Sequence, residues 1–344
     1  MYPTPCAVQA ETGPGRAGCK PPATCYSLII PVYNNESSID ALLESLERMN
    51  QCLQGRMQVV FVVDGSQDRS CEQLREGLGT CGFASELVLL SRNFGSFAAI
   101  RMGLSIAAGP YFAVMAADLQ EPPQLVPEFF RCLSEEPVDI ALGVRTGRDD
   151  PLLSKTSANL FWSIYRRLVQ RDMPPGGIDA FGCNVAVRDA LLGLHESNSS
   201  LVGQVLWLGF RRKHIPYVRL ARCGGVSGWT LRRKLRYMFD SIFSFTDLPL
   251  TLLMLVGSLG MAFSALAWAV VLIAWLLGAI GVPGYTPIIL TILTAMFSQW
   301  LGMGIIGAYL WRTFENTKQR PAFVPMLQQS FPAAVSAGEK EQAA

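Results

Sequence analysis

The sequence has little histidine and no paired-cysteine motif. Only His195 and His214 occur among 344 residues, which leaves little scope for a histidine-based triad or a multi-histidine metal centre. The nine cysteines include no Cys-x-x-Cys pair and are odd in number, so they indicate neither a zinc site nor a disulfide framework. They suit a reducing compartment, and any chemistry should depend on carboxylates. The cysteines are Cys6, Cys19, Cys25, Cys52, Cys71, Cys81, Cys132, Cys183 and Cys223.

The chain also lacks a strong net charge. The formal charge is +2, and the lysines and arginines are not interleaved with stacking aromatic residues in the way that RNA-binding surfaces require. The composition therefore gives no reason to expect a nucleic-acid partner.

Half of the residues of the whole chain are apolar, and residues 248–311 contain no charged side chain. Leu250–Ala279 and Pro287–Leu310 each exceed the roughly 20 helical residues that cross a hydrocarbon core. We expect a two-helix transmembrane hairpin over 248–312; the alternative is a buried hairpin in a soluble domain. The linker is short and uncharged while basic residues flank the spans, so the positive-inside rule predicts an integral membrane protein with both termini in the cytoplasm. The flanking residues are Arg232, Arg233, Lys234, Arg236, Arg312, Lys318 and Arg320.

The remaining chain divides by composition. Residues 1–24 are rich in Pro, Gly and Ala without a signal-peptide core, so a flexible tail is expected. Residues 25–228 have the character of a soluble α/β domain. Residues 229–247 combine basic and apolar side chains at helical spacing, which predicts an amphipathic helix in the membrane interface. Residues 313–344 are predicted to be a cytoplasmic tail.

Within 25–228, short β-branched runs alternate with helical patterns. This alternation predicts an α/β fold with right-handed crossovers and a mostly parallel sheet. The expected strands are Tyr26–Val32, Met57–Val63, Glu86–Ser91, Tyr111–Ala116 and Val138–Gly143; the expected helices are Glu36–Met49, Ser70–Leu78, Ser96–Ala108 and Pro151–Arg171.

Polar loops follow three of these strands. They are Tyr33 to Glu36, Asp64-Gly65-Ser66 and Asp118-Leu119-Gln120. Ligands of such sheets bind at the carboxyl ends of the strands, so the loops should converge on one crevice. A turn-rich stretch at 174–177 introduces Asp179, whose carboxylate could point into the same crevice.

Several residues in this crevice have a functional and a plain interpretation. Asp118 and Gln120 offer the oxygen ligands that Mg²⁺ or Mn²⁺ prefers, but Asp118 could instead cap a helix near Pro122. Arg145 and Arg148 could pair with phosphate oxygens, or they could be solvated surface residues. Asp64 could equally be an ordinary turn residue.

Taken in order, five motifs resemble family 2 glycosyltransferases, most closely the polyprenyl-phosphate branch. They are Ile30-Pro31-Val32-Tyr33-Asn34, Asp64-Gly65-Ser66, Ser91-Arg92-Asn93-Phe94-Gly95, Ala117 to Pro123 and Gly143-Val144-Arg145-Thr146. The likeness runs from about Tyr26 to Pro321. It implies a GT-A fold, a nucleotide-sugar donor, a divalent cation, inversion at the anomeric carbon, a polyprenyl phosphate acceptor for cell-envelope glycan or lipid modification, and a homo-oligomer, a tetramer in similar proteins.

The resemblance also implies roles for particular residues. Asp118 and Gln120 would hold Mg²⁺ or Mn²⁺, and Asp179 and Asp118 would lie at the reacting centre. The nucleotide sugar would contact Pro31, Tyr33, Asn34, Asp64, Arg92, Asn93, Gly95 and Asp118. The acceptor or phosphate side would involve Arg145, Arg148, Arg222 and Ser227.

The sequence departs from the family pattern at four positions. Val63 and Ala116 each replace a carboxylate, Asn35 replaces a glutamate, and Gly228 replaces a lysine. Losing a carboxylate should weaken cation affinity without abolishing it, because Asp118, Gln120 and the donor diphosphate remain. Two alternatives stay open: a transferase acting on another membrane acceptor, and a non-catalytic membrane partner that has kept the fold.

Overall fold

The computed structural model describes residues 25–147, 173–174, 177–194, 200–220, scattered positions between 252 and 277, 285–318 and 320–334. Several predictions lie outside these residues: the tail over 1–24, the helix over 151–171, the interfacial helix over 229–247 and most of the first span. The same holds for Arg148, Arg222, Ser227 and Gly228.

The described residues include an eight-stranded sheet in the order β7-β5-β6-β4-β1-β2-β3-β8. Two strands, β6 and β8, run antiparallel to their neighbours, and the others are parallel to one another. The mostly parallel α/β sheet that the sequence predicts is therefore confirmed. The strands are β1 (Tyr26–Val32), β2 (Met57–Val63), β3 (Ala84–Leu90), β4 (Tyr111–Val114), β5 (Ile140–Gly147), β6 (Ile178–Asn184), β7 (Arg212–Val218) and β8 (Pro325–Phe331).

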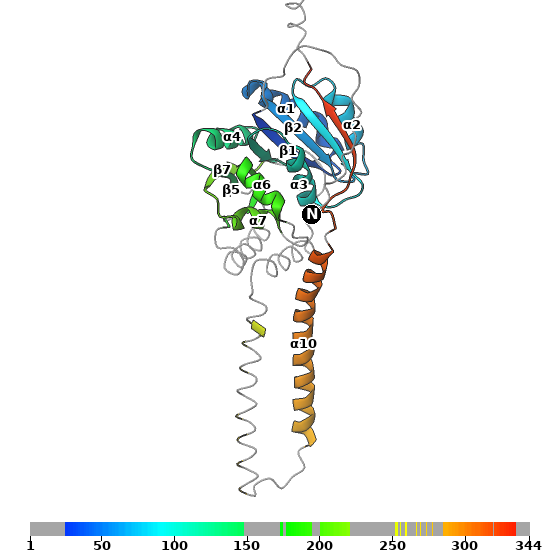
Figure 1. The fold of residues 1–344 in the computed structure, drawn as a ribbon, viewed down its shortest axis with the longest axis vertical. Helices are drawn as coiled ribbons and strands as arrows, with labels where there is room; N and C mark the ends of the chain where they lie inside the picture. The colour runs from blue at the N-terminus through cyan, green and yellow to red at the C-terminus, as the bar shows by residue number, and fades with distance from the viewer. Residues whose placement is uncertain are drawn as a thin grey trace, which may run out of the picture.

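Helices cover both faces of the sheet, because side chains of its central strands alternate between two buried clusters (Figure 1). In β1, Leu28 and Ile30 join the cluster formed with α1, α2 and α4, whereas Ile29 joins the cluster formed with α3, α6 and α7. The helices are η1 (Glu36–Ser38), α1 (Ile39–Cys52), α2 (Ser70–Leu78), α3 (Ser96–Ile106), α4 (Leu125–Glu135), α6 (Val185–Gly193), α7 (Leu201–Trp207) and α10 (Tyr285–Thr317).

The register of the central strands sets the position of the loops. Tyr26 pairs with Met57 and Val32 with Val63 in the parallel β1–β2 ladder. The two strands end at the same level, so Tyr33 and Asp64 emerge side by side at the carboxyl edge of the sheet. Asp64 N–H donates to the carbonyl of Val32 at 2.9 Å, which fixes this exit.

The segment after α10 differs from the tail predicted for 313–344. Helix α10 continues to Thr317, and β8 then pairs antiparallel with β3 at the edge of the sheet. Phe331 packs against the first buried cluster. The strand has a weak signature because, apart from its two ends, it is built of Met, Leu, Gln and Ser and only its inner face is half-buried.

Helix α10 is 33 residues long and extends away from the sheet (Figure 1). In the part of the chain that the structure describes, no helix combines the length and apolarity needed for a membrane span.

Candidate active site

The loops after β1 and β2 are cross-braced by short polar side chains. Asn34 N–H donates to Ser66 Oγ at 3.2 Å, and Gln67 N–H donates to Asn34 Oδ1 at 3.1 Å. Asn34 has a φ of 53°, a left-handed conformation that asparagine tolerates better than most residues. The bracing leaves the Tyr33 side chain 46% exposed at the mouth of the site, where a flat ligand can stack on it.

Asp64 organises a third loop, between β3 and α3. Its Oδ1 accepts from Phe94 N–H at 2.7 Å and its Oδ2 from Gly95 N–H at 2.8 Å, while only 2% of the residue is exposed. Gly65, with a φ of 63°, lies so close that a Cβ would come within 2.5 Å of the backbone of Arg92 and Asn93. The plain interpretation of Asp64 as a turn residue is therefore incomplete, because it ties the loop containing Arg92, Asn93 and Gly95 to the end of β2.

The loop after β4 places Asp118 and Gln120 at the same edge of the sheet. Leu119 between them has a φ of 54°, and Ser38 Oγ donates to the carbonyl of Ala117 at 3.0 Å. Asp118 is not the helix cap considered above, since Gln124 occupies the N-cap position of α4 without a side-chain hydrogen bond.

Glu121 is a buried carboxylate in the same loop, and the sequence does not single it out. It is 2% exposed, and its Oε2 has no hydrogen-bond partner among the described residues. Burial, followed by the negative charges of Asp118 and Asp179, raises the pKa of Glu121 to about 7. The charges of Asp118 and Asp179 therefore act on Glu121 at this edge of the sheet.

Asp179, near the start of β6, is held by groups from two other strands. Arg145 Nη2 donates to its Oδ1, and the Tyr217 hydroxyl donates to its Oδ2 at 3.1 Å. Because β6 runs against β5 and β7, its beginning lies beside their ends, so residues distant in sequence meet. Burial, then the charge of Asp179, raises the pKa of the Tyr217 hydroxyl, which stays a hydrogen-bond donor.

Arg219 joins this group to the loop after β4. Its Nη1 lies 3.8 Å from Asp179 Oδ2, and its Nη2 donates to Gln120 Oε1. Tyr217 and Arg219 are absent from the sequence prediction because β7 is not among the predicted strands. The β-branched and aromatic residues Ile215, Tyr217 and Val218 are the signal in the sequence that could have found this strand.

The donor set of this edge fits a hard divalent cation. Oxygen atoms come from Asp118, Gln120 and Glu121, and the Glu121 Oε2 that lacks a partner among the described residues would be stabilised by a positive charge. Among the described residues, no group of three or more His, Cys, Asp or Glu side chains is arranged to hold a metal ion by itself. A cation here would need further ligands from a bound molecule or water.

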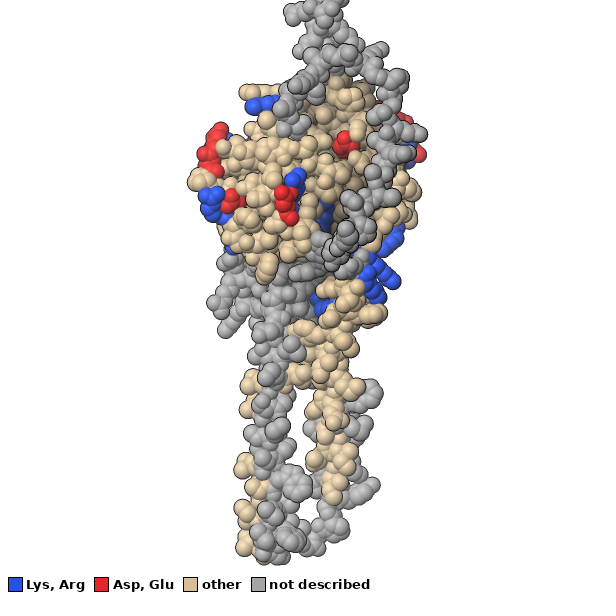
Figure 2. Space-filling model, viewed as in Figure 1, with Lys and Arg blue, Asp and Glu red and all other residues tan. Residues whose placement is uncertain are grey.

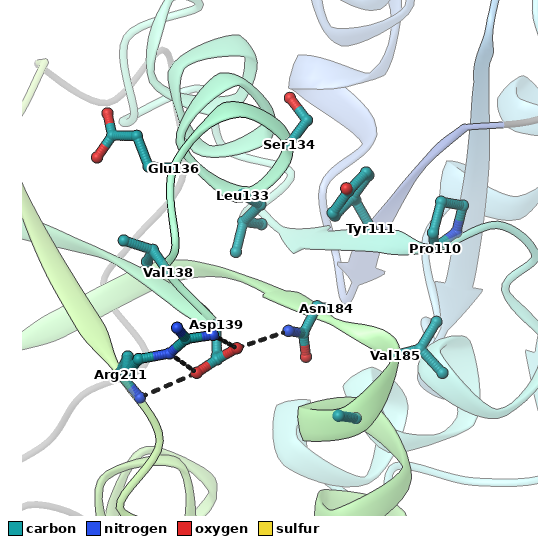
Figure 3. Close-up of a pocket in the computed structure, with 11 residues that line it drawn as sticks. Pro110, Tyr111, Leu133, Ser134, Glu136, Val138, Asp139, Asn184, Val185 and Arg211 are labelled. Atoms are coloured by element: carbon teal, nitrogen blue, oxygen red, sulfur yellow. Dashed lines mark hydrogen bonds and ion pairs between the residues drawn. The ribbon is translucent and has the colours of Figure 1, made fainter.

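A separate cavity of about 470 Å³ lies at the opposite end of the sheet, beside the first residues of β4 and β5 (Figure 3). Asp139 is its central polar residue. It accepts from Arg211 Nε at 2.9 Å and from Asn184 Nδ2 at 3.0 Å. The hydrogen-bonding groups of Asp139, Arg211 and Asn184 therefore satisfy one another. We interpret these contacts as structural, because they connect the ends of β5, β6 and β7.

Comparisons with known proteins agree with this architecture. Residues 27–193 match the family described as glycosyl transferase family 2. The putative glycosyltransferase CsbB of Bacillus subtilis is 31% identical over 87% of this chain and 90% of its own length. The chain belongs to glycosyl transferase family 2. It is a glycosyltransferase with a GT-A fold, as its resemblance to the family implies.

A second relative and one solved structure are also similar to this chain. The undecaprenyl-phosphate 4-deoxy-4-formamido-L-arabinose transferase of Serratia proteamaculans is 30% identical over 88% of this family 2 glycosyltransferase and 93% of its own length. A mannosyltransferase of Pyrobaculum calidifontis, solved with GDP-mannose and Mn²⁺, is 16% identical with a TM-score of 0.44, over 84% of this chain and 88% of that one.

The structure shows the surroundings of three residues at which this family 2 glycosyltransferase departs from the family's motifs. Val63 is fully buried in the first cluster, so a core side chain stands in place of the first carboxylate. Ala116 is half-buried and offers no ligand. Asn35 braces its own loop, since its Oδ1 accepts from Tyr33 N–H at 3.0 Å.

Proposed function

We propose that this enzyme transfers a sugar, with inversion, from a nucleotide-sugar donor to a polyprenyl phosphate at the cytoplasmic face of a membrane. The observation that carries the proposal is the state of Asp179, whose two oxygens are engaged by Arg145 and Tyr217. A carboxylate held in this way is poorly placed to remove a proton. A hydroxyl acceptor would need such a base, whereas a phosphate acceptor is already ionised at neutral pH.

Arg145 supports an anionic acceptor in a second way. Its side chain is 11% exposed, and its Nε has no hydrogen-bond partner among the described residues. A buried donor of this kind costs free energy unless a ligand satisfies it. Phosphate oxygens match the guanidinium fork in charge and geometry, so Arg145 suits either the acceptor phosphate or the donor diphosphate.

The relatives support the acceptor class. The Serratia proteamaculans protein carries undecaprenyl phosphate in its name, and the similarity extends over nearly the whole of both chains. A sugar acceptor with a long apolar tail is most accessible to an enzyme that works at the bilayer surface, because the tail then stays out of water.

The membrane arrangement is part of the proposal. Large apolar side chains on α10 are more than half exposed, among them Ile288, Ile292, Met303, Ile306 and Leu310. Figure 2 shows basic side chains where the head meets α10 and mainly uncharged residues along α10. Such a surface is expected to face lipid. Two spans over 248–312 with both termini in the cytoplasm would bring the acceptor to the crevice.

Within this function the residues have distinct tasks. Tyr33, Asn34 and the loop held by Asp64 would bind the nucleotide, with Pro31 fixing the preceding strand end. Asp118 and Gln120, with Glu121 beside them, would hold Mg²⁺ or Mn²⁺, which supplies charge neutralisation for the diphosphate leaving group. Arg145, oriented by Asp179, would position the acceptor phosphate, whose oxygen attacks the anomeric carbon as the bond to the diphosphate breaks.

The test is a transfer reaction with full-length protein in detergent. Undecaprenyl phosphate and diacylglycerol are supplied in parallel reactions, each with Mn²⁺ and a panel of nucleotide sugars, and the lipid product is analysed by mass spectrometry. We expect a polyprenyl-phosphate sugar with one donor, and its loss in Asp118→Ala. A product formed on diacylglycerol in place of undecaprenyl phosphate would reject the acceptor assignment while retaining the transferase.

A further inference from the structure

Arg219 occupies an unusual position in the site. It follows β7, and the backbone there is fixed because Leu220 N–H donates to the Gln120 carbonyl at 2.9 Å. The side chain then returns across the same loop, so that Nη2 donates to Gln120 Oε1. Main chain and side chain thus hold Gln120 together, and the guanidinium lies between the loop after β4 and Asp179.

One oxygen in this arrangement serves two kinds of cation. Gln120 Oε1 is the amide oxygen that the proposed function gives to the divalent cation, yet in this structure it accepts from a guanidinium. A guanidinium and a divalent cation cannot share that oxygen at close range without strong repulsion, because both are positive and the site is partly shielded from water. Arg219 must therefore move away when the cation binds.

Arg219 has hydrogen-bond donors available for another partner. Its Nε has no hydrogen-bond partner among the described residues, and its Nη1 is 3.8 Å from Asp179 Oδ2, so its existing contacts do not use its full donor capacity. The diphosphate of a nucleotide sugar would enter the same crevice with the cation. Its oxygens are better partners for a guanidinium than a neutral amide is.

We propose that Arg219 holds Gln120 until a divalent cation binds there, and that it then transfers to the donor diphosphate. This inference rests on the proposed function only in placing a cation and a diphosphate at Gln120. Before the cation binds, Arg219 offsets the neighbouring carboxyl groups of Asp118, Glu121 and Asp179. In the loaded site, it binds the leaving group and holds it in line for the reaction.

The experiment measures two affinities on full-length protein in detergent. Mn²⁺ binding without any nucleotide is followed by electron paramagnetic resonance, and binding of inorganic pyrophosphate with saturating Mn²⁺ is followed by calorimetry. In Arg219→Gln we expect Mn²⁺ alone to bind about tenfold more tightly, since a competing charge is gone. We expect pyrophosphate with Mn²⁺ to bind about tenfold or more weakly, since a charged donor is lost.

The matched control is Lys213→Gln, which removes one positive charge from the other end of β7, where Lys213 pairs with Glu136 at 2.6 Å. Both affinities should stay at the wild-type value in this variant. Gln120→Ala supplies an independent test if Arg219→Gln fails to fold. It releases Arg219 without a metal, so metal-free pyrophosphate should bind several-fold more tightly than to the wild type.

The proposal requires that Arg219→Gln changes the two affinities in opposite directions, with Mn²⁺ alone bound more tightly and pyrophosphate bound more weakly. Unchanged or weakened Mn²⁺ binding in Arg219→Gln would overturn the exchange, and so would unchanged pyrophosphate binding. Neither arm contains a lipid acceptor. Failure here therefore leaves the polyprenyl phosphate assignment intact, and failure of the transfer reaction leaves the exchange intact.

Discussion

At the scale of single residues, Asp64 links the core of the sheet to the loop that is proposed to bind the nucleotide. Its two oxygens hold the backbone N–H groups of Phe94 and Gly95 at 2.7 and 2.8 Å. Asp64→Asn keeps the size but replaces one acceptor with an amide that must face a backbone donor. We expect the affinity for the nucleotide-sugar donor to fall about tenfold or more, because a charge-assisted bond is lost and the loop loosens. Calorimetric titration of the donor measures this.

Glu72→Gln is a suitable control for Asp64→Asn. It removes a negative charge from an exposed ion pair with Arg69 on α2 and leaves the loop untouched. Donor affinity should not change in the control. Equal affinity in Asp64→Asn and wild type would show that the loop is held by other contacts.

Asp139 predicts a pH dependence of stability away from the site. Hydrogen bonds from Arg211, more than any other contact, hold the pKa of Asp139 below its usual range. A lowered folded-state pKa stabilises the protein above the unfolded pKa, and this contribution is lost as pH falls through the folded pKa. Asp139→Asn should therefore lower the free energy of unfolding at pH 7 by about 1 to 3 kcal/mol, which appears as a lower melting temperature. The difference from wild type should narrow below about pH 4.

Differential scanning fluorimetry of full-length protein in detergent, from pH 7 down to pH 3, measures this difference. Asp189→Asn is the control, because the Asp189 side chain is 59% exposed and pairs with the adjacent Arg188. A constant Asp139→Asn difference over the whole range would contradict the argument.

At the scale of elements, the sequence predicts strands best where apolar runs are unbroken. Tyr26–Val32 and Met57–Val63 have the bounds that the structure has, because both strands are buried on two faces. β7 and β8 lie at the two edges of the sheet, and their polar faces dilute the apolar pattern. β6 follows directly after the turn-rich stretch at 174–177 and contains Asp179. It is not among the strands that the sequence predicts, and neither is its antiparallel pairing.

The same reason explains which site residues the sequence finds. Asp64, Asp118 and Gln120 lie in loops between strands that are near one another in the chain. Tyr217 and Arg219 reach Asp179 and Gln120 only through the pairing of β7 with β5, a long-range contact that no local pattern encodes. The structure brings these residues together, and their assigned roles stay predictions.

The β8 strand also makes a prediction at this scale. Phe331 pairs with Ser85 of β3 and packs on the first buried cluster. Phe331→Ala should destabilise the protein by roughly 1 to 3 kcal/mol, less than for a fully buried phenylalanine, because the residue is only half-buried. Faster amide hydrogen exchange in β3 measures the accompanying loosening. Ser330→Ala, on the outer face of β8, should leave exchange unchanged, and equal exchange in both variants would reject the packing role of Phe331.

At the scale of the whole molecule, the sheet is assembled from segments on both sides of α10. β8 follows α10 in the chain, yet it completes the edge of a sheet whose other strands all precede α10. The Ser91 N–H donates to the Val324 carbonyl at 3.0 Å, so the segment leaving α10 is bonded to the loop that Asp64 holds. Movement of α10 relative to the sheet would therefore act on the loop that is proposed to bind the nucleotide.

This arrangement predicts that the sheet does not keep its stability when the chain is truncated at residue 247. A protein ending at residue 247 lacks β8 and leaves the N–H and C=O groups of β3 unpaired, an edge that favours association between copies. We expect it to aggregate or to melt at a lower temperature than a protein in which a flexible linker joins residue 247 to residues 322–334. Size-exclusion chromatography and thermal unfolding of the two proteins decide the matter. If the shorter protein is monomeric and equally stable, β8 is dispensable. Any coupling between α10 and the loop that joins β3 to α3 would then have to run through another part of the chain.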